Sequence, residues 1–309
     1  MKKLILYICL IVLLGANAWL LWQGYPYVKS YGRLVSDKIH ASDVKIFMTY
    51  HKPYQLPFEQ KILQPIQVGR AVEREPFFGG QLSDKNIEWL HAHTIGDDTG
   101  DNISAKNRSF DVLTAYYWVW KHYKEIGNPK YIGFLAHRKI FMLTDNDVRN
   151  FRRFAPDYGY TEQELKKLLE EHKIITYFWA TYHEDAPVSV YEEYFYSHHI
   201  EDLNAMIASI KRHYPEMVPV MEDVLHNVHK EYAIWNFWIM EKELAWDYFE
   251  KLFPIMFEVE KERSAEIAEY DLEQRRVFGY LAERFFAIWV EYQTRLGKAD
   301  PLFAGVRYL

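Results

Sequence analysis

Three consecutive basic residues, His137, Arg138 and Lys139, follow a short apolar stretch at 131–135. An arginine can hold two phosphate oxygens at once, and a lysine adds a compact positive charge. A histidine can move a proton near neutral pH. The pattern therefore predicts a site that stabilises an anion, for example a diphosphate that leaves during group transfer. The alternative is a solvated strand end with ordinary surface charges.

A polar loop at 97–107 precedes this cluster and is rich in residues that form turns. Within it, Asp98, Asp101 and Asn102 can hydrogen bond to the hydroxyls of a sugar or a ribose. The loop does not match a calcium-binding EF-hand, because its twelfth position is Arg108 rather than Glu. The alternative is that these side chains only cap the helix that follows.

Candidate ligands also follow the first predicted strand. Tyr50 ends this apolar stretch, and His51 and Lys52 come directly after it. Because open α/β sheets bind ligands beyond the carboxyl ends of their strands, these side chains are candidates for substrate contacts. A structural turn is the alternative. Asn236 lies in an apolar stretch at 233–240 and needs hydrogen-bond partners if it is buried, either on a substrate or on a neighbouring backbone.

The last predicted helix carries two more candidates, Glu283 and Arg284. Glu283 lies off the apolar stripe of this helix, where its carboxylate could remove a proton from an attacking hydroxyl. The alternative is a structural ion pair with Arg275 or Arg276. Arg284 is a candidate contact to substrate.

A rival arrangement for handling a diphosphate would use a metal ion. Asp145 and Asp147 form an Asp-x-Asp pair that could bind Mn²⁺ or Mg²⁺ through carboxylate oxygens. The pair lies several residues beyond the predicted strand and could simply cap a short helix. We therefore expect no metal cofactor and assign the stabilisation of the leaving group to the basic cluster.

The composition is that of a folded, aromatic-rich protein. The 309 residues are 49% hydrophobic and 17% aromatic, which excludes general disorder. The formal net charge of −6 gives no support to a nucleic-acid partner. The single cysteine, Cys9, excludes a disulfide framework and a cysteine-ligated zinc site.

The amino terminus predicts a membrane element. Lys2 and Lys3 precede an uncharged stretch at 4–22, which as a helix would span roughly 28 Å, close to the thickness of a bilayer core. We predict an uncleaved single-pass anchor at 1–24 and a tether at 25–43. A cleaved signal peptide is the alternative, because Ala16-Asn17-Ala18 has the form of a cleavage site.

The remainder, 44–309, predicts one α/β domain with a helical carboxyl-terminal part. Four stretches are predicted to be strands, at 44–50, 131–135, 174–179 and 233–240. Predicted helices cover 110–126, 161–172, 200–213, 216–230, 241–263 and 273–296. The stretch at 64–84 contains three glycines and two prolines and is interpreted as a loop.

Six segments of this domain resemble a bacterial family of predicted glycosyltransferases, which belong to the synthesis of capsule, exopolysaccharide and lipopolysaccharide. The segments are Tyr50–Lys52, Gly96–Ser104, Thr114–Lys121, Ile132–Phe141, Asn236–Met240 and Arg276–Arg284. In the family, the strand-end segment usually reads His-Tyr-Arg-Arg-Tyr-Phe. Here it reads Ala-His-Arg-Lys-Ile-Phe at 136–141, so the histidine is displaced by one position.

The resemblance implies a GT-A-like (Rossmann-like) mixed sheet flanked by helices and a nucleotide-sugar donor. It implies a hexosyltransferase that acts on a glycan or lipid-linked acceptor, with Tyr50, His51 and Lys52 near the base or ribose of the donor. We expect the domain at the cytoplasmic face of a membrane, with the periplasm or the Golgi lumen as alternatives. A hydrolase is less well supported, because no Gly-x-Ser-x-Gly occurs. The non-enzymatic alternative is a membrane-anchored glycan-binding or scaffold protein.

Overall fold

The computed structural model describes residues 42–54, 61–143, 161–178, 180–228 and 232–308. These residues form a seven-stranded sheet with the order β10-β6-β9-β4-β1-β2-β3. Strands β4, β1, β2 and β3 are parallel, whereas β9 is antiparallel to its neighbours β4 and β6. The strands are β1 (Val44–Tyr50), β2 (Leu63–Gln67), β3 (Ile95–Gly96), β4 (Tyr131–Ala136), β6 (Ile174–Thr176), β9 (Trp238–Glu241) and β10 (Leu302–Phe303). The mixed α/β fold matches the predicted class.

Two small antiparallel sheets and the helices complete the described fold. Strand β5 (Lys139–Met142) pairs with β11 (Gly305–Tyr308), and β7 (Tyr182–His183) pairs with β8 (Ala186–Pro187). The α-helices are α2 (Asp84–His93), α3 (Asn107–Phe110), α4 (Leu113–Lys121), α5 (Glu162–His172), α6 (Val190–Ser197), α7 (Ile200–His213), α8 (Val218–His226), α9 (Lys242–Ala268) and α10 (Val277–Arg295). The short 3-10 helices are η1 (Arg70–Val72), η2 (Ser104–Lys106), η4 (Pro215–Met217) and η5 (Gln274–Arg276).

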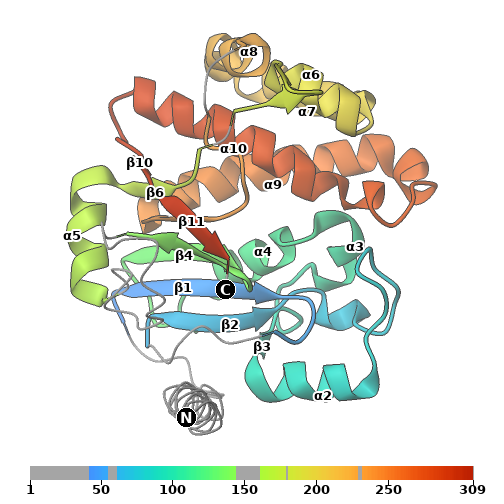
Figure 1. Cartoon of the computed structure of the whole chain (residues 1–309), viewed down its shortest axis with the longest axis vertical. Helices are drawn as coiled ribbons and strands as arrows, with labels where there is room; N and C mark the ends of the chain where they lie inside the picture. Colours follow the sequence, from blue (N-terminus) through green and yellow to red (C-terminus); the bar gives the residue numbers. More distant parts are fainter. Residues whose placement is uncertain (1–41, 55–60, 144–160, 179, 229–231, 309) are drawn as a thin grey trace, which may run out of the picture.

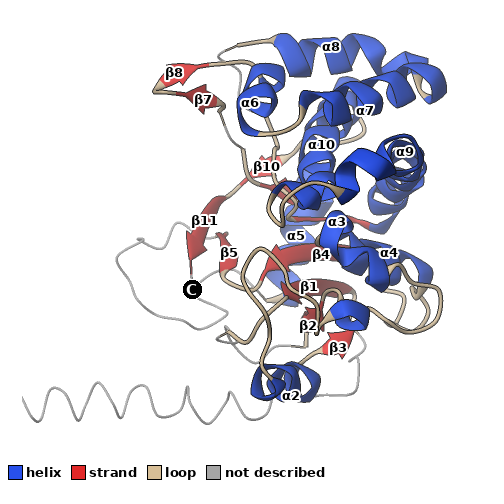
Figure 2. Cartoon of the chain, turned by 90° about the vertical axis from the view of Figure 1, so that its right-hand side faces the viewer, coloured by secondary structure: helices blue, strands red, loops and turns tan. Residues whose placement is uncertain are grey.

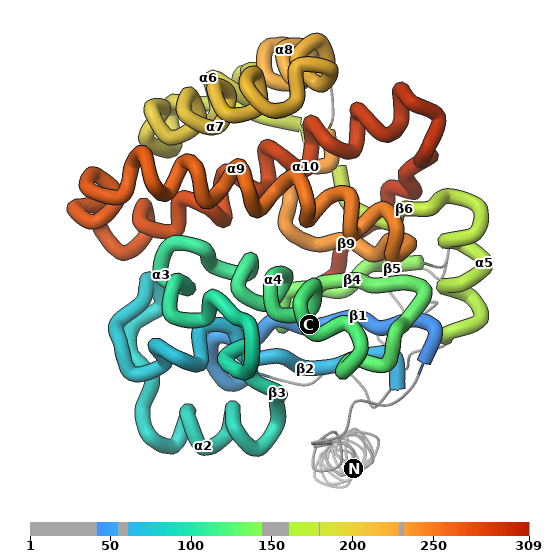
Figure 3. The backbone as a smooth tube through the Cα atoms, turned by 180° about the vertical axis from the view of Figure 1, so that it is seen from behind, coloured from blue at the N-terminus to red at the C-terminus, as the bar shows by residue number. Residues whose placement is uncertain are grey.

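The elements are arranged in layers. Helices α9 and α10 lie between the sheet and an outer group formed by α6, α7 and α8 (Figures 1 and 3). Helix α2 lies beside β3, at the opposite side of the sheet from α9 (Figure 1). Helix α5 lies beside the amino ends of β1 and β2, whereas α3 lies toward their carboxyl ends (Figure 1).

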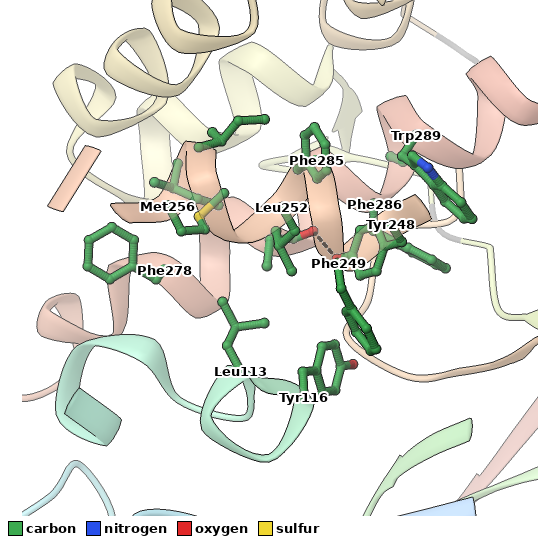
Figure 4. Close-up of a cluster of buried hydrophobic side chains, with 14 of the residues drawn as sticks. Leu113, Tyr116, Tyr248, Phe249, Leu252, Met256, Phe278, Phe285, Phe286 and Trp289 are labelled. Carbon is green, nitrogen blue, oxygen red and sulfur yellow. Dashed lines mark hydrogen bonds between the residues drawn. The ribbon is translucent and has the colours of Figure 1, made fainter. Parts of the chain in front are cut away.

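Aromatic side chains fill the core between the sheet and the long helices. Tyr116 of α4 packs on Phe134 of β4 with ring centroids 4.1 Å apart, and Trp238 of β9 lies 5.2 Å from Phe134. Tyr248 and Phe249 of α9 extend the cluster towards α10 (Figure 4). Burial of several such rings supplies the largest favourable term in folding and fixes α4, α9 and α10 against the sheet.

The stretch at 64–84, interpreted from sequence as a loop, contains strand β2, so that prediction was wrong at its beginning. Pro65 pairs with Met48 of β1, and all five residues of β2 are buried. Proline is excluded from central strands because it has no N–H. It is tolerated here because β3 pairs only with Ile66 and Gln67, so that β2 is the sheet edge at Pro65.

Other predictions of local structure were confirmed or need new bounds. Thr161 caps α5 and accepts a hydrogen bond from the Glu164 N–H, as the sequence predicted. Gly297, with φ +65°, follows α10 in the left-handed conformation expected after a helix end. The strand predicted at 233–240 begins only at Trp238. Helix α2, which the sequence analysis did not predict, lies between β2 and β3.

No helix of the described residues has the length and apolar character needed to cross a membrane. The predicted anchor at 1–24 and nearly all of the predicted tether at 25–43 lie outside the described residues. Asp145 and Asp147 also lie outside them.

Candidate functional site

The order of the strands creates a crevice at the carboxyl ends of β1, β2 and β4. Strand β1 is paired on one side with β2 and on the other with β4, and both pairings are parallel. The chain runs from β1 to β2 and β3 on one side and then crosses to β4 on the other. Such a reversal separates the loops at the carboxyl ends of the two strands, and ligands of open α/β sheets bind there. Figure 2 views the fold from this side.

A cavity of about 210 Å³ lies at this position. His51 and Lys52 line it directly after β1, Val68 and Gly69 line it after β2, and Arg138 lines it after β4. Two further groups of lining residues come from more distant segments, namely Asn107, Arg108 and Asp111 around α3, and Leu272, Arg275 and Arg276 before α10. The structure thus brings the sequence candidates His51, Lys52 and Arg138 together around one space.

The cavity has an excess of positive charge. Its described lining contains five cationic side chains and two carboxylates. The cations are Lys52, Arg108, Arg138, Arg275 and Arg276, and the carboxylates are Glu73 and Asp111. Low-dielectric walls strengthen the field of such a cluster, so the cavity favours an anion.

The contacts of the five cations leave most of their positive charge uncompensated. Neither Lys52 nor Arg138 makes an ion pair or hydrogen bond with the described part of the chain. Arg108 donates to the backbone oxygens of Val72 and Glu75, the latter at 2.8 Å, and these carbonyls carry no net charge. Arg275 likewise donates to two backbone oxygens, at 2.9 and 3.0 Å. These arginines are held in place without being neutralised.

Among the described residues, Arg276 is the cation of the cavity that forms an ion pair with a carboxylate. Its Nη2 lies 2.6 Å from Oδ2 of Asp111, and this carboxylate raises the pKa of Arg276. The second carboxylate, Glu73, accepts hydrogen bonds from Gln67 Nε2 at 2.7 Å and contacts His91 Nε2 at 2.9 Å. It is therefore engaged away from the cations.

Two imidazoles are in contact at the carboxyl ends of β1 and β4. The ring of His137 meets that of His51 edge-on, with centroids 4.9 Å apart. His137 Nδ1 lies 3.2 Å from the Thr49 carbonyl oxygen and must donate to it, because a carbonyl only accepts. Its Nε2 is buried and has no hydrogen-bond partner within the described structure.

Both imidazoles are neutral at neutral pH. Burial lowers the pKa of His51 to about 4, and the charges of Lys52, Arg276, Arg138 and Arg108 act in the same direction. Burial, then His51 and Arg138, lower the pKa of His137 to about 3. The neighbouring cations thus add to the effect of burial and disfavour any further positive charge, which suits a site for an anion.

Aromatic and apolar side chains also line the cavity. Phe77, Phe78 and Leu82 line the cavity, and Phe78 is 55% exposed. The ring of Phe77 lies 5.6 Å from that of His51. The guanidinium of Arg108 lies 5.8 Å from the ring centre of Phe77, and that of Arg276 lies 6.0 Å from that of Phe78. Aromatic rings and cations therefore lie side by side in the lining.

Lys139 lies away from the cavity. His137 and Arg138 form a turn between β4 and β5, and Lys139 is the first residue of β5. Its Nζ lies 3.8 Å from the ring centre of Trp235 and 5.3 Å from that of Tyr308. The basic cluster seen in the sequence is therefore divided, and Arg138 is the member that reaches the cavity lining.

The candidates from the 97–107 loop also lie outside the cavity lining. Asn102 Nδ2 donates to the carbonyls of Asp98 and Gly100 at 3.1 and 3.0 Å, and its Oδ1 accepts from the Ser104 N–H. Asp101 accepts a hydrogen bond from the Tyr117 hydroxyl at 3.1 Å. The hydrogen bonds of Asn102 and Asp101 therefore stabilise the loop and its contact with α4.

Asp97, which the sequence analysis did not single out, ties this loop to the site. Its buried carboxylate accepts hydrogen bonds from the backbone N–H groups of Gly69 and Arg70 and from the Ser104 hydroxyl, at 2.8, 3.1 and 2.5 Å. Gly69 has φ +68°, and a Cβ there would lie 2.4 Å from Asn107. The exit of β2 is therefore locked against the segment that carries Arg108.

Four other candidates lie in packed surroundings. Tyr50 is buried, with its ring 6.2 Å from that of Trp89. Asn236 Nδ2 donates to the Gly279 carbonyl at 2.7 Å, which joins the segment before β9 to α10. Arg284 is buried in ion pairs with Glu193 and Glu283. Burial raises the pKa of Glu283. Its ion-pair partner is Arg284, rather than Arg275 or Arg276 as the sequence analysis considered.

Sequence reasoning missed much of the cavity lining. Arg108, Asp111, Arg275 and Arg276 approach it from segments far apart in the chain. The sequence contained one indication of these residues. Arg275 and Arg276 form a second basic pair, directly before the long helix α10. Within the described residues, no group of three or more His, Cys, Asp and Glu side chains is placed to hold a metal ion.

The fold and the cavity together define an α/β protein with a cationic site at the switch point of its sheet. The solved apo structure of WbbM, a bifunctional glycosyltransferase, has a similar fold, with a TM-score of 0.69 and 25% sequence identity over 86% of this chain. The chain spans 45% of the length of that structure. No curated protein matches the chain. Residues 45–294 match the family described as a domain of unknown function, DUF4422, and the chain belongs to this family.

Proposed function

We propose that this protein is a glycosyltransferase that moves a hexose from a nucleoside diphosphate donor to a hydroxyl of an acceptor. The cationic cavity carries the proposal, because a diphosphate is the anion that five cations at a sheet switch point would best stabilise. The structural likeness to WbbM, a bifunctional glycosyltransferase, supports the same class of reaction.

The donor would contact the cations of the cavity with its diphosphate and the aromatic rings with its base. Lys52 and Arg138 would take the diphosphate oxygens, since neither has a partner in the described part of the chain. Phe77 and Phe78 would stack on the base. His51, neutral before the donor binds, could donate a hydrogen bond to a phosphate oxygen.

Charge builds on the diphosphate as the bond to the sugar breaks. Arginines already fixed by backbone carbonyls, such as Arg108 and Arg275, need little reorganisation to stabilise that charge. We therefore propose that cations of the protein, rather than Mn²⁺ or Mg²⁺ held by Asp145 and Asp147, stabilise the leaving group.

The acceptor would be a glycan or a lipid-linked glycan, and the biological setting the synthesis of a cell-surface polysaccharide. With the predicted anchor at 1–24, the domain would work at a membrane, on the cytoplasmic face where nucleotide sugars are made in bacteria. A reporter fused after Leu309 would test this location, and a signal from the outer side of the membrane would contradict it.

The direct experiment measures release of nucleotide from a panel of UDP- and GDP-hexoses. We expect release from at least one donor by the parent protein, in EDTA as well as in Mn²⁺. Arg138→Ala should reduce it by about 100- to 1,000-fold, since removal of one donor to the charge of a transition state costs about 2.7–4 kcal/mol.

Lys139→Ala is the matched control, because it removes the adjacent positive charge outside the cavity. Failure of the whole panel would contradict the proposed function. An absolute requirement for Mn²⁺ would contradict only the metal-independent part. Equal losses in the two variants would remove Arg138 from the site.

A further inference from the structure

Asp111, between α3 and α4, has a backbone conformation that an L-residue rarely adopts. Its φ is 48° and its ψ is −129°, a combination that favours glycine. Such a conformation costs free energy and persists where the surroundings enforce it, most often at functional sites. Asp111 is also one of the two carboxylates in the described cavity lining.

The neighbours of Asp111 enforce this conformation. Asn107 Nδ2 donates to the Asp111 carbonyl at 2.8 Å, and the Thr114 hydroxyl donates to the same oxygen at 3.1 Å. Gly279 of α10 lies against the side chain, and a Cβ at that glycine would be 3.0 Å from Asp111 Cβ and 3.1 Å from Oδ2. The backbone of Asp111 is therefore held by α3 and α4, and its side chain lies against α10.

One oxygen of this carboxylate remains available. Oδ2 accepts from Arg276 Nη2 at 2.6 Å, whereas Oδ1 receives no hydrogen bond from the described residues. The side chain keeps 23% of its surface exposed, toward the cavity that it lines. The guanidinium of Arg276 fixes the orientation of the group, as a third residue orients the base in other catalytic sites.

The competing carboxylates are placed less well. Glu73 is held through Oε2 alone, by Gln67 and His91, and among the described residues no arginine or lysine of the cavity pairs with it to orient its other oxygen. Glu283, the base predicted from sequence, does not line the cavity and pairs with the buried Arg284 at 3.2 Å. Asp111 combines an oxygen that receives no hydrogen bond from the described residues, an orientation fixed by Arg276 and a place among the cations.

We propose that Asp111 is the catalytic base of the proposed glycosyl transfer, an inference that rests on that function. Oδ1 takes the proton of the acceptor hydroxyl while the oxygen forms its bond to the anomeric carbon of the donor. The bond from that carbon to the diphosphate oxygen breaks, and the nucleoside diphosphate leaves with the electron pair. Water can replace the acceptor in the same step, giving the free sugar.

The strained backbone makes a catalytic role separable from a structural one. Glycine fits the conformation of residue 111 without strain, so Asp111→Gly should keep or raise the melting temperature while abolishing the base. If the carboxylate only held Arg276 for stability, Asp111→Gly and Asp111→Asn would both lower the melting temperature.

The test measures nucleotide release from the UDP- and GDP-hexose panel, with UDP and GDP binding measured in parallel by thermal shift. We expect Asp111→Asn to lose at least about 100-fold in release and to keep its shift with UDP or GDP, because general base catalysis contributes about 10²–10⁴-fold. In Asp111→Gly, the space vacated by the side chain should admit formate, and added formate should restore part of the rate.

Each outcome decides a different claim. If the parent protein releases no nucleotide, the proposed function fails, and this inference fails with it. If the parent is active and Asp111→Asn retains its rate, the assignment of the base alone is overturned. Loss of rate in Glu283→Gln with retention in Asp111→Asn would return the role to Glu283. Absence of formate rescue in a folded Asp111→Gly would also overturn the assignment.

Discussion

Two arginines near the beginning of α10 differ in the balance of charge around them. Arg276 lies directly before the helix, and Arg284 lies about two turns further on, near its middle. Arg284 is 4% exposed and is paired with two carboxylates, Glu193 and Glu283. Arg276 has one, Asp111, in a cavity with four other cations. A buried charge that is fully compensated holds helices together, whereas an uncompensated excess beside a cavity prepares a place for an anion. The difference separates structural arginines from binding arginines.

The largest effect that this comparison predicts is on stability. Arg284→Met leaves Glu193 and Glu283 without their cation in a mostly buried place, so we expect the free energy of unfolding to fall by about 3–5 kcal/mol. Urea denaturation measures the change. Arg276→Met should cost less than about 1 kcal/mol, because its ion pair with Asp111 is partly solvated. A larger loss for Arg276→Met would invert the comparison.

The next effect is on binding. Arg276→Ala should weaken UDP or GDP binding by about 1.5–3 kcal/mol, or roughly 10- to 150-fold, with the melting temperature nearly unchanged. Titration calorimetry measures the affinity. A variant that binds as tightly as the parent would show that Arg276 serves only Asp111.

The neutral histidines predict a pH effect on stability. The pKa of His137 is lowered to about 3, whereas in an unfolded chain histidine titrates near 6.5. Between these values the unfolded state binds more protons, so the free energy of unfolding falls as the pH falls. At pH 5 the loss from this residue is about 2 kcal/mol relative to pH 7.

Urea denaturation at pH 7 and pH 5 checks this effect, with His137→Asn as the comparison. The variant should lose less stability than the parent on acidification. The same loss in both proteins would show that His137 does not carry the effect.

The smallest expected effects are those of variants that lie outside the cavity, and they test which residues do not contact the donor. Lys139→Ala and Asp101→Asn lie outside the lining and should change UDP or GDP affinity by less than about 0.5 kcal/mol. A loss in Lys139→Ala equal to that in Arg138→Ala would mean that the donor extends over the rings of Trp235 and Tyr308.

The sequence predicted the parts of the site that depend on short-range order. The buried strands β1 and β4 were visible as apolar stretches, and their carboxyl ends located Lys52 and Arg138 correctly at one edge. The sequence did not show that Arg138 and Lys139 lie in different surroundings. Lys139 begins β5, and this strand pairs with β11 at the other end of the chain, a contact that no local pattern indicates.

The other half of the lining depends on tertiary contacts. Asp111 and Arg276 are 165 residues apart and meet because Gly279 lets α10 approach the end of α3. No local pattern reports such a contact. Strand β2 was missed because Pro65 suggests a loop, and the short reach of β3 that tolerates it is also a tertiary feature.

The central claim is that the cavity holds the diphosphate of a nucleotide. Calorimetric titration of the parent protein and a Lys52→Ala, Arg138→Ala double variant with UDP, GDP, uridine and guanosine tests it most directly. We predict that one diphosphate binds the parent at least about 100-fold more tightly than its nucleoside, and that the double variant loses most of this difference. Equal affinity for diphosphate and nucleoside in the parent, or an unchanged difference in the variant, would contradict the account.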